Sequence, residues 1–218
     1  KAPNNFDLLQ ERIRWKHQQW VNNEGGVEKP VHKETYAKDY EQARLEWLKE
    51  ECQETTSILE MGCGDGYVLK HVLGDRFAGS AAAGLDKNME TIEANKAEYP
   101  QVNWQCWDAT QLPLPLGDGE YEIVLLPAVL EHLPWDRVAP LIMDAVRVSK
   151  HKVLITIPNA TYPTYLKDVV ESVGKHQWAL TRDRLYLLSL VFLSQFWPKP
   201  ASINVNYGSD VSSVYFKV

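Results

Sequence analysis

The sequence predicts an α/β protein built on a doubly wound, mostly parallel sheet, with helices on both faces and therefore three layers. Short apolar runs alternate with helical patterns along the middle of the chain. A glycine-rich turn joins the first of these runs to a helix. At the carboxyl end, two short runs flank a Gly-Ser-Asp turn, which is typical of an antiparallel hairpin. Such a hairpin would form one edge of the sheet.

Composition sets bounds on the kind of protein. The 218 residues suffice for one domain, and 44% hydrophobic and 24% charged residues are ordinary for a soluble protein. A net charge of -6 offers no basic surface, so nucleic acid is not an expected partner. No apolar run reaches the roughly 20 residues of a membrane span, and no secretory signal is visible. Three cysteines without a Cys-x-x-Cys pair predict a reduced, cytoplasmic protein, and the oligomeric state is left open.

Two amphipathic helices are expected before the sheet, at about 1–20 and 33–52. They define a predicted N-terminal helical lid over residues 1–52, in which Tyr36 or Tyr40 closes over a bound ligand. The same pattern also fits helices that only cover the sheet.

The first strand runs from Ser57 and carries Glu60, directly before the turn Gly62-x-Gly64-x-Gly66. Glycine takes positive φ cheaply and lets a ligand press against the backbone. The turn lacks the Gly-Lys-Ser/Thr of a phosphate-binding loop and is shorter than the Gly-x-Gly-x-x-Gly of dinucleotide sites. A carboxylate beside the turn would repel a diphosphate but suits an ammonium or sulfonium group. Together these features favour S-adenosylmethionine (SAM).

Two later strands end in acids. The strand at 80–86 ends in Asp86, about 20 residues past the last glycine, where an acid reaches the ribose hydroxyls of a nucleoside. The strand at 102–107 is followed by Asp108, which is placed to accept a hydrogen bond from an adenine amino group. Each acid would also serve as a cap for the next helix. Their shared position at the carboxyl ends of strands favours binding.

The remaining elements complete a main domain over residues 53–218. They are a helix at 88–99, strands at 121–126 and 152–157 with a helix at 135–149 between them, and hairpin strands at 202–206 and 213–218. The sheet would then have seven strands. An insertion at about 159–200, rich in aromatic residues, would build the pocket for a second substrate.

The four motifs Glu60–Gly66, Asp86, Asp108 and 121–126, in this order, resemble the series of class I SAM-dependent methyltransferases of the methyltransferase-11 and ubiquinone O-methyltransferase type. The resemblance covers about 57–158 and implies a Rossmann-like sheet, SAM as cofactor and S-adenosylhomocysteine (SAH) as product. The cofactor-binding residues that it implies are Glu60, Gly62, Cys63, Gly64, Gly66, Asp86, Lys87, Met89, Asp108, Ala109, Leu126 and Pro127. The glycines would cradle the methionine part, with Glu60 on its ammonium, while Lys87, Met89 and Ala109 flank the nucleoside.

His132 is the expected catalytic residue. A hydroxyl acceptor must lose a proton, so a base should stand near the fourth or fifth strand. His132 follows the fourth strand, and an unshifted imidazole is partly neutral at physiological pH. A histidine that only packs under the following helix is the alternative.

The expected acceptor is a small molecule, phenolic or sugar-like, and O-methylation is favoured. No Asn/Asp-Pro-Pro-Tyr, the motif that amino-group methyltransferases carry, follows the fourth strand. Tyr162, His176 and Trp178 are the predicted substrate contacts, because aromatic faces stack on planar rings and on sugars. Ordinary packing is the other interpretation of this aromatic segment.

Two alternative functions stay open. Glu131, His132 and His176 resemble metal ligands of small-RNA 2′-O-methyltransferases, but Ala128 stands where those enzymes have a fourth ligand. No metal is therefore the first expectation. The second alternative is a non-catalytic, SAM-binding partner subunit.

Overall fold

The structure is a computed structural model, and it describes residues 42, 44–77, 79, 81–158, 202–207 and 211–217. The strands are β1 (Ser57–Met61), β2 (Ala81–Asp86), β3 (Asn103–Cys106), β4 (Tyr121–Pro127), β5 (Ser149–Pro158), β6 (Ser202–Tyr207) and β7 (Val211–Lys217). The helices are α3 (Tyr67–Leu73), α4 (Met89–Glu98) and α5 (Trp135–Val148), with short 3-10 turns η1 (Gly74–Arg76) and η2 (Leu130–His132).

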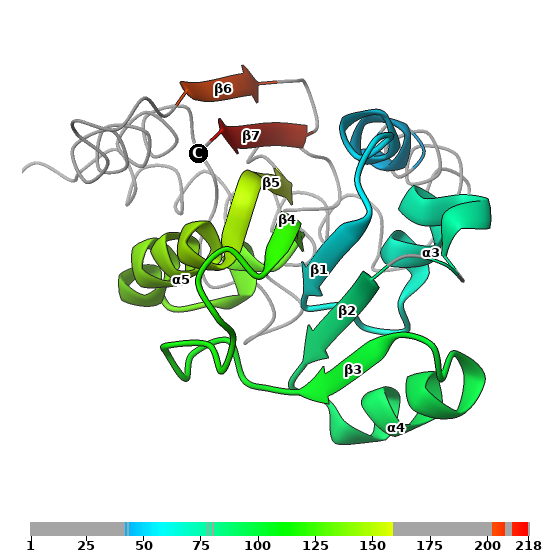
Figure 1. The fold of residues 1–218 in the computed structure, drawn as a ribbon. Coiled ribbons are helices and arrows are strands. Elements are labelled where there is room, and N and C mark those ends of the chain that lie inside the picture. Colours follow the sequence, from blue (N-terminus) through cyan, green and yellow to red (C-terminus); the bar gives the residue numbers. More distant parts are fainter. Residues whose placement is uncertain are drawn as a thin grey trace, which may run out of the picture.

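The sheet has the order β3-β2-β1-β4-β5-β7-β6 (Figure 1). The strands from β3 to β5 are parallel, which confirms the predicted parallel α/β sheet for these five. The last two strands pair antiparallel, β7 with β5 and β6 with β7. The chain steps from β1 outward to β2 and β3, then returns to place β4 on the other side of β1. This reversal creates a switch point at the carboxyl ends of β1 and β4, where ligands bind in such sheets.

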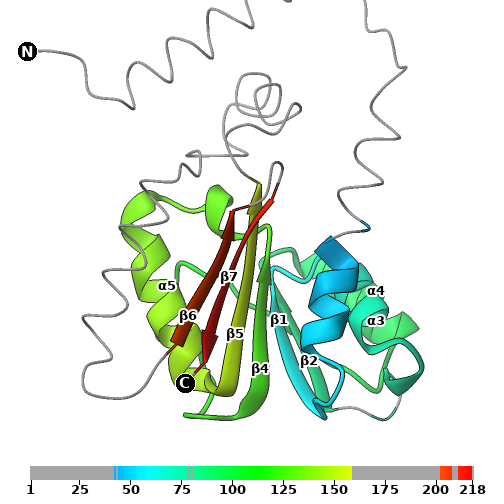
Figure 2. The same cartoon turned by 90° about the horizontal axis from the view of Figure 1, so that it is seen from above.

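Helices cover both faces of the sheet (Figure 2). One face carries α5, and the other carries α3, α4 and the helical residues 44–51. In α5 the buried positions Val138, Leu141, Ile142 and Ala145 recur at helical spacing and pack against the strands. A second hydrophobic cluster fills the opposite side, between the sheet and α3. The arrangement is therefore three layers around two cores.

The C-terminal end of the predicted lid packs into the hydrophobic core. Leu45 and Leu48 are completely buried in the cluster that also contains Ile58 and Leu69. Burial of each leucine contributes roughly 1.5–3 kcal/mol. Lys152 adds an ion pair at 3.0 Å to Glu51. The remainder of the predicted lid, with Tyr36 and Tyr40, lies outside the described residues, as does the insertion at 159–200.

The boundary between α5 and β5 differs from the prediction. The helix that was expected to end at residue 149 ends at Val148, and β5 begins at Ser149 instead of 152. Ser149 pairs with Tyr121 across an irregularity in the ladder, and its hydroxyl donates to the Lys152 carbonyl at 2.7 Å. These contacts depend on the tertiary structure. Among the described helices, none has the length and apolar character needed to cross a membrane.

Candidate functional site at the glycine turn

The conformation of the turn between β1 and α3 depends on three glycines and on backbone hydrogen bonds to β2. All three glycines have positive φ, +69° at Gly62, +48° at Gly64 and +74° at Gly66. The amides of Gly62 and Cys63 both donate to the carbonyl of Leu85 in β2, at 2.7 and 3.0 Å. The turn is thereby fixed to the neighbouring strand at the switch point of the sheet.

The space around the glycines separates their roles. A Cβ at Gly62 would lie 2.5 Å from Val129, and one at Gly66 would lie 2.6 Å from the indole of Trp104. A Cβ at Gly64 would meet no atom within 4 Å. Two glycines therefore allow close packing inside the protein, whereas Gly64 faces open space.

Glu60 lies behind the turn rather than in it. Its side chain is 1% exposed, and its Oε2 accepts a hydrogen bond from the Leu69 amide at 3.0 Å, in the first turn of α3. That amide has no partner within the helix, so the carboxyl group satisfies it. Burial raises the pKa of Glu60 to about 8, and the nearby Asp65 and Asp86 act in the same direction. The predicted contact of Glu60 with an ammonium group stays a prediction.

Asp86 connects the turn to the next helix. Its Oδ2 accepts from the Gly64 amide at 3.0 Å, and its Oδ1 accepts from the Asn88 amide at 2.9 Å. A carboxylate offers about four acceptor positions. Both oxygens therefore retain capacity for a further donor such as a ribose hydroxyl.

Asp108 follows β3 at the same edge of the sheet. Its Oδ1 accepts from the amide and the hydroxyl of Thr110, at 2.9 and 2.8 Å. These hydrogen bonds lower the pKa of Asp108 below its ordinary value, so the group is ionised at neutral pH. Ala109 packs, partly buried, against the α5 side of the core. No hydrogen bond to a described residue is recorded for Oδ2, which leaves an acceptor atom for a ligand.

Four further predicted cofactor contacts flank this edge, and Cys63 lies within the turn. Lys87 and Met89 are exposed just beyond β2, with Met89 56% exposed at the start of α4. Leu126 and Pro127 are buried at the end of β4, so only their backbone can face a ligand. Burial raises the pKa of the Cys63 thiol, which argues against a thiolate role.

The predicted base lies at the neighbouring strand end. His132 is exposed and is the last residue of η2. It lies four residues after Ala128, the residue that directly follows β4. Ala128 has φ +55°, an unusual value for a residue with a Cβ, and its amide donates to the Thr156 carbonyl at 2.9 Å. The backbone therefore reverses sharply at the sheet edge that carries the acids.

Glu131 is buried, whereas its neighbour His132 is exposed. It is 0% exposed, and neither carboxyl oxygen has a hydrogen-bond partner among the described residues. Burial raises its pKa to about 8. The described residues contain no group of three side chains able to hold a metal. The third residue of the metal alternative, His176, lies outside them, and so do the predicted substrate contacts Tyr162 and Trp178.

Sequence reasoning missed two residues that shape the turn. Asn95 in α4 is 3% exposed and donates from Nδ2 to the Gly64 carbonyl at 2.7 Å. Trp104 in β3 fills the space left by Gly66 and Gly84, and its indole donates to the Tyr99 carbonyl at 3.0 Å. An asparagine on the otherwise apolar side of α4, close to Ile92, was the available signal for the first.

Comparison with known proteins agrees with this geometry. A family model described as a methyltransferase domain matches residues 58–152. A Mycolicibacterium smegmatis protein named as a probable S-adenosylmethionine-dependent methyltransferase is 34% identical over 106 residues, which are 47% of this chain. The match spans only 38% of that relative.

Solved structures share the fold at low sequence identity. The methyltransferase domain of bacterial CtHen1 aligns with a TM-score of 0.63 and 16% identity, over 82% of this chain and 99% of that one. Magnesium protoporphyrin IX methyltransferase from Synechocystis, with bound SAH, aligns with a TM-score of 0.54 and 16% identity, over 100% and 89%. Residues 58–152 therefore form a methyltransferase domain, and the sheet that contains them has the fold of methyltransferases of known structure.

Proposed function

We propose that this chain transfers a methyl group from SAM to a hydroxyl of a small-molecule acceptor. The observation that carries the proposal is an open glycine position, Gly64, among carboxylates. Asp65 and Asp86 are close enough to raise the pKa of the buried Glu60. Such surroundings oppose a diphosphate and favour a ligand with ammonium and sulfonium charges. The strand order, with its antiparallel β7 and β6, also supports this class.

The residues around the turn fit the three parts of SAM. We assign the methionine part to Gly62–Gly66 and to the backbone at Leu126 and Pro127, with Glu60 behind the turn as the partner of the ammonium group. Asp86 takes the ribose and Asp108 the adenine amino group, because each lies at a strand end with acceptor capacity left. Lys87, Met89 and Ala109 would flank the nucleoside.

The bound cofactor would supply a methyl group already activated by the sulfonium charge. The chain then has to orient the acceptor in line with that methyl group, exclude water and take up the hydroxyl proton. His132, exposed after β4, is the residue that we assign to the proton. We further assign the acceptor pocket to 159–200, with Tyr162, His176 and Trp178 as contacts.

The first test is titration calorimetry with SAH, with NADH titrated in parallel. We expect SAH to bind and NADH not to bind. Asp86→Asn should weaken SAH, whereas Asp136→Asn, an exposed acid on α5, changes the net charge equally and should not. Binding of NADH, or equal affinity for SAH in both variants, would contradict the cofactor assignment.

His132→Ala provides the test of catalysis once an acceptor is found. We expect kcat to fall by about 10²–10⁴-fold, the usual contribution of a general base, with the Kd for SAH unchanged. The measurement is transfer of labelled methyl from SAM, with SAH calorimetry on the same variant. Unchanged kcat would remove His132 as the base.

One observation favours a second function. The buried Glu131 has no partner among the described residues, and it stands beside His132 as in the metal-assisted RNA alternative. Labelled SAM with RNA and with phenolic acceptors, each with and without EDTA, separates the two. Methylation of RNA that EDTA abolishes would replace our proposal. SAH binding without methylation of any acceptor would favour a non-catalytic partner subunit.

We also place the protein in the cytoplasm. The three cysteines Cys52, Cys63 and Cys106 are free thiols, and two of them are buried. Unpaired cysteines are typical of a reducing compartment.

A further inference from the structure

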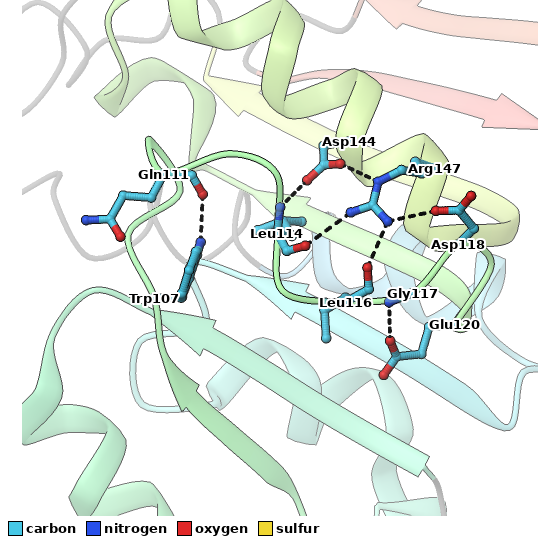
Figure 3. A network of polar contacts seen from close by, with 9 residues as sticks. All are labelled: Trp107, Gln111, Leu114, Leu116, Gly117, Asp118, Glu120, Asp144 and Arg147. Carbon is cyan, nitrogen blue, oxygen red and sulfur yellow. Dashed lines mark hydrogen bonds and ion pairs between the residues drawn. The ribbon is translucent and has the colours of Figure 1, made fainter.

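Two charged residues at the end of α5 hold the loop between β3 and β4 (Figure 3). The Leu114 amide donates to Asp144 Oδ2 at 2.5 Å. Arg147 donates to the carbonyls of Leu114 and Leu116, at 3.2 and 2.8 Å, and to Asp118 Oδ1 at 2.9 Å. Between them, Asp144 and Arg147 therefore satisfy both backbone groups of Leu114.

The two residues also hold each other. Arg147 Nε lies 2.6 Å from Asp144 Oδ1, and the Asp144 side chain is only 9% exposed. The hydrogen bonds that Arg147 donates to Asp144 and Asp118 raise the pKa of Arg147 above its ordinary value, so the guanidinium stays charged. Charge-assisted hydrogen bonds in a planar fork are strong and directional. The loop cannot shift without breaking several of them together.

The same loop begins at the strand end that carries Asp108. The Trp107 indole donates to the Gln111 carbonyl at 2.9 Å, and the Gln111 amide donates to the Asp108 carbonyl at 2.8 Å. Trp107 and Ala109 pack against the hydrophobic cluster that contains the buried Leu114. The segment around Asp108 and the segment held by α5 thus rest on one cluster, six residues apart in the chain.

We propose that Asp144 and Arg147 are positioning residues for the adenine side of the cofactor site. They fix the loop at 114–118, and through the cluster under Leu114 they fix the segment 107–111 that presents Asp108. Neither residue touches the ligand. The proposal rests on the proposed function, in which Asp108 accepts from the adenine amino group.

The test compares two ligands in Arg147→Lys and Asp144→Asn. One ligand is SAH, and the other is its 6-deamino analogue, whose purine carries hydrogen in place of the amino group. A lysine ammonium cannot reach all four acceptors that the guanidinium fork reaches, on Leu114, Leu116, Asp118 and Asp144. We expect the Kd for SAH to rise about tenfold, as for partial loss of one hydrogen bond to a charged group. The Kd for the analogue should change by less than about twofold, because it never made that bond.

Two variants complete the design. Arg137→Lys is the matched control, since Arg137 lies on α5 but pairs only loosely with Asp136 at 3.9 Å. Asp118→Ala removes one exposed contact of Arg147 and leaves the buried pair intact, so it should fold normally and show a smaller, SAH-specific loss. This variant keeps the test decisive if the others fail to fold.

The outcomes separate the two proposals. Equal weakening of both ligands, or no weakening of SAH in the Arg147, Asp144 and Asp118 variants, would overturn the positioning role alone. A wild-type chain that binds neither ligand would overturn the proposed function and this inference with it. Weakening that is confined to SAH supports both.

Discussion

The three glycines of the turn are required for different physical reasons. Gly62 and Gly66 leave room for Val129 and Trp104, so any side chain there would collide inside the protein. Gly64 has no neighbour that a Cβ would strike, and its cost is conformational, at φ +48°. Stability and ligand binding should therefore separate when these positions are changed one at a time.

Gly64→Ala should cost about 1–2 kcal/mol of stability from the left-handed backbone and lower the affinity for SAH at least tenfold. Gly66→Ala should cost about 1–3 kcal/mol more, because it also overpacks Trp104. Gly74→Ala is the matched control: it has φ +52° and open space, but it lies at the far end of α3. Denaturant melts and calorimetry provide both quantities. Equal SAH affinity in Gly64→Ala and Gly74→Ala would show that Gly64 does not face the ligand.

Glu60 predicts a pH dependence of stability. Its pKa is raised by burial from an ordinary 4.5 to about 8, so between these values the native protein holds a proton that the unfolded chain has released. Stability contributed by this group is complete below the lower value and falls as pH rises, by up to about 1.4 kcal/mol per pH unit. Glu60→Gln should flatten the curve between pH 5 and pH 8 (about the range of the shift) while still accepting from Leu69. Parallel curves for wild type and variant, from urea melts at several pH values, would refute the raised pKa.

At the scale of elements, α4 acts as a support for the turn. Its N-cap is Asn88, whose side chain accepts from the amides of Glu90 and Thr91, so the helix begins directly after the β2 acid. Six positions into the helix, Asn95 reaches back to the Gly64 carbonyl at 2.7 Å. The helix thereby holds the carbonyl of Gly64, the position that we assign to the ligand.

Asn95→Ala should cost about 1–3 kcal/mol, because it leaves a carbonyl without its donor, and it should weaken SAH binding as the turn loosens. Glu93→Ala, one exposed substitution on the same helix, should stay within about 0.5 kcal/mol and leave affinity unchanged. Melts and SAH titrations on both variants are the measurement. A stability loss in Asn95→Ala without any change in affinity would limit Asn95 to a packing role.

Elements of this fold follow from sequence wherever the information is local. The five parallel strands were predictable from apolar runs, and Asp86 and Asp108 from their place at strand ends. Asn95 and Arg147 were not, since the Gly64 carbonyl lies 31 residues from Asn95 and the loop partners of Arg147 lie 29 to 33 residues from it, and these contacts form only after α4 and α5 dock. The early start of β5 at Ser149 has the same origin, in pairing with Tyr121.

For the whole molecule, a cofactor site at the switch point would couple ligand binding to global stability. SAH that binds only the folded state should stabilise it by about 2.7 kcal/mol at 100 times its Kd. Thermal melts with increasing SAH should therefore show a rising Tm, and NADH should leave it unchanged. Asp86→Asn should reduce the SAH-induced shift. A constant Tm for wild type at high SAH concentration would contradict binding to the native fold.

The indole beneath the turn has a kinetic consequence. Trp104 is 3% exposed and fills the volume that Gly66 and Gly84 leave. The glycine turn therefore packs against a buried, planar indole, with no ligand needed for this contact. We expect a loop supported in this way to keep its conformation when no ligand is bound. The next cofactor would then enter a ready-made cradle, and its association rate would rise linearly with concentration, without a slower folding phase. Exchange of SAH for SAM would then be limited by diffusion of SAM and by release of SAH, and not by refolding of the loop.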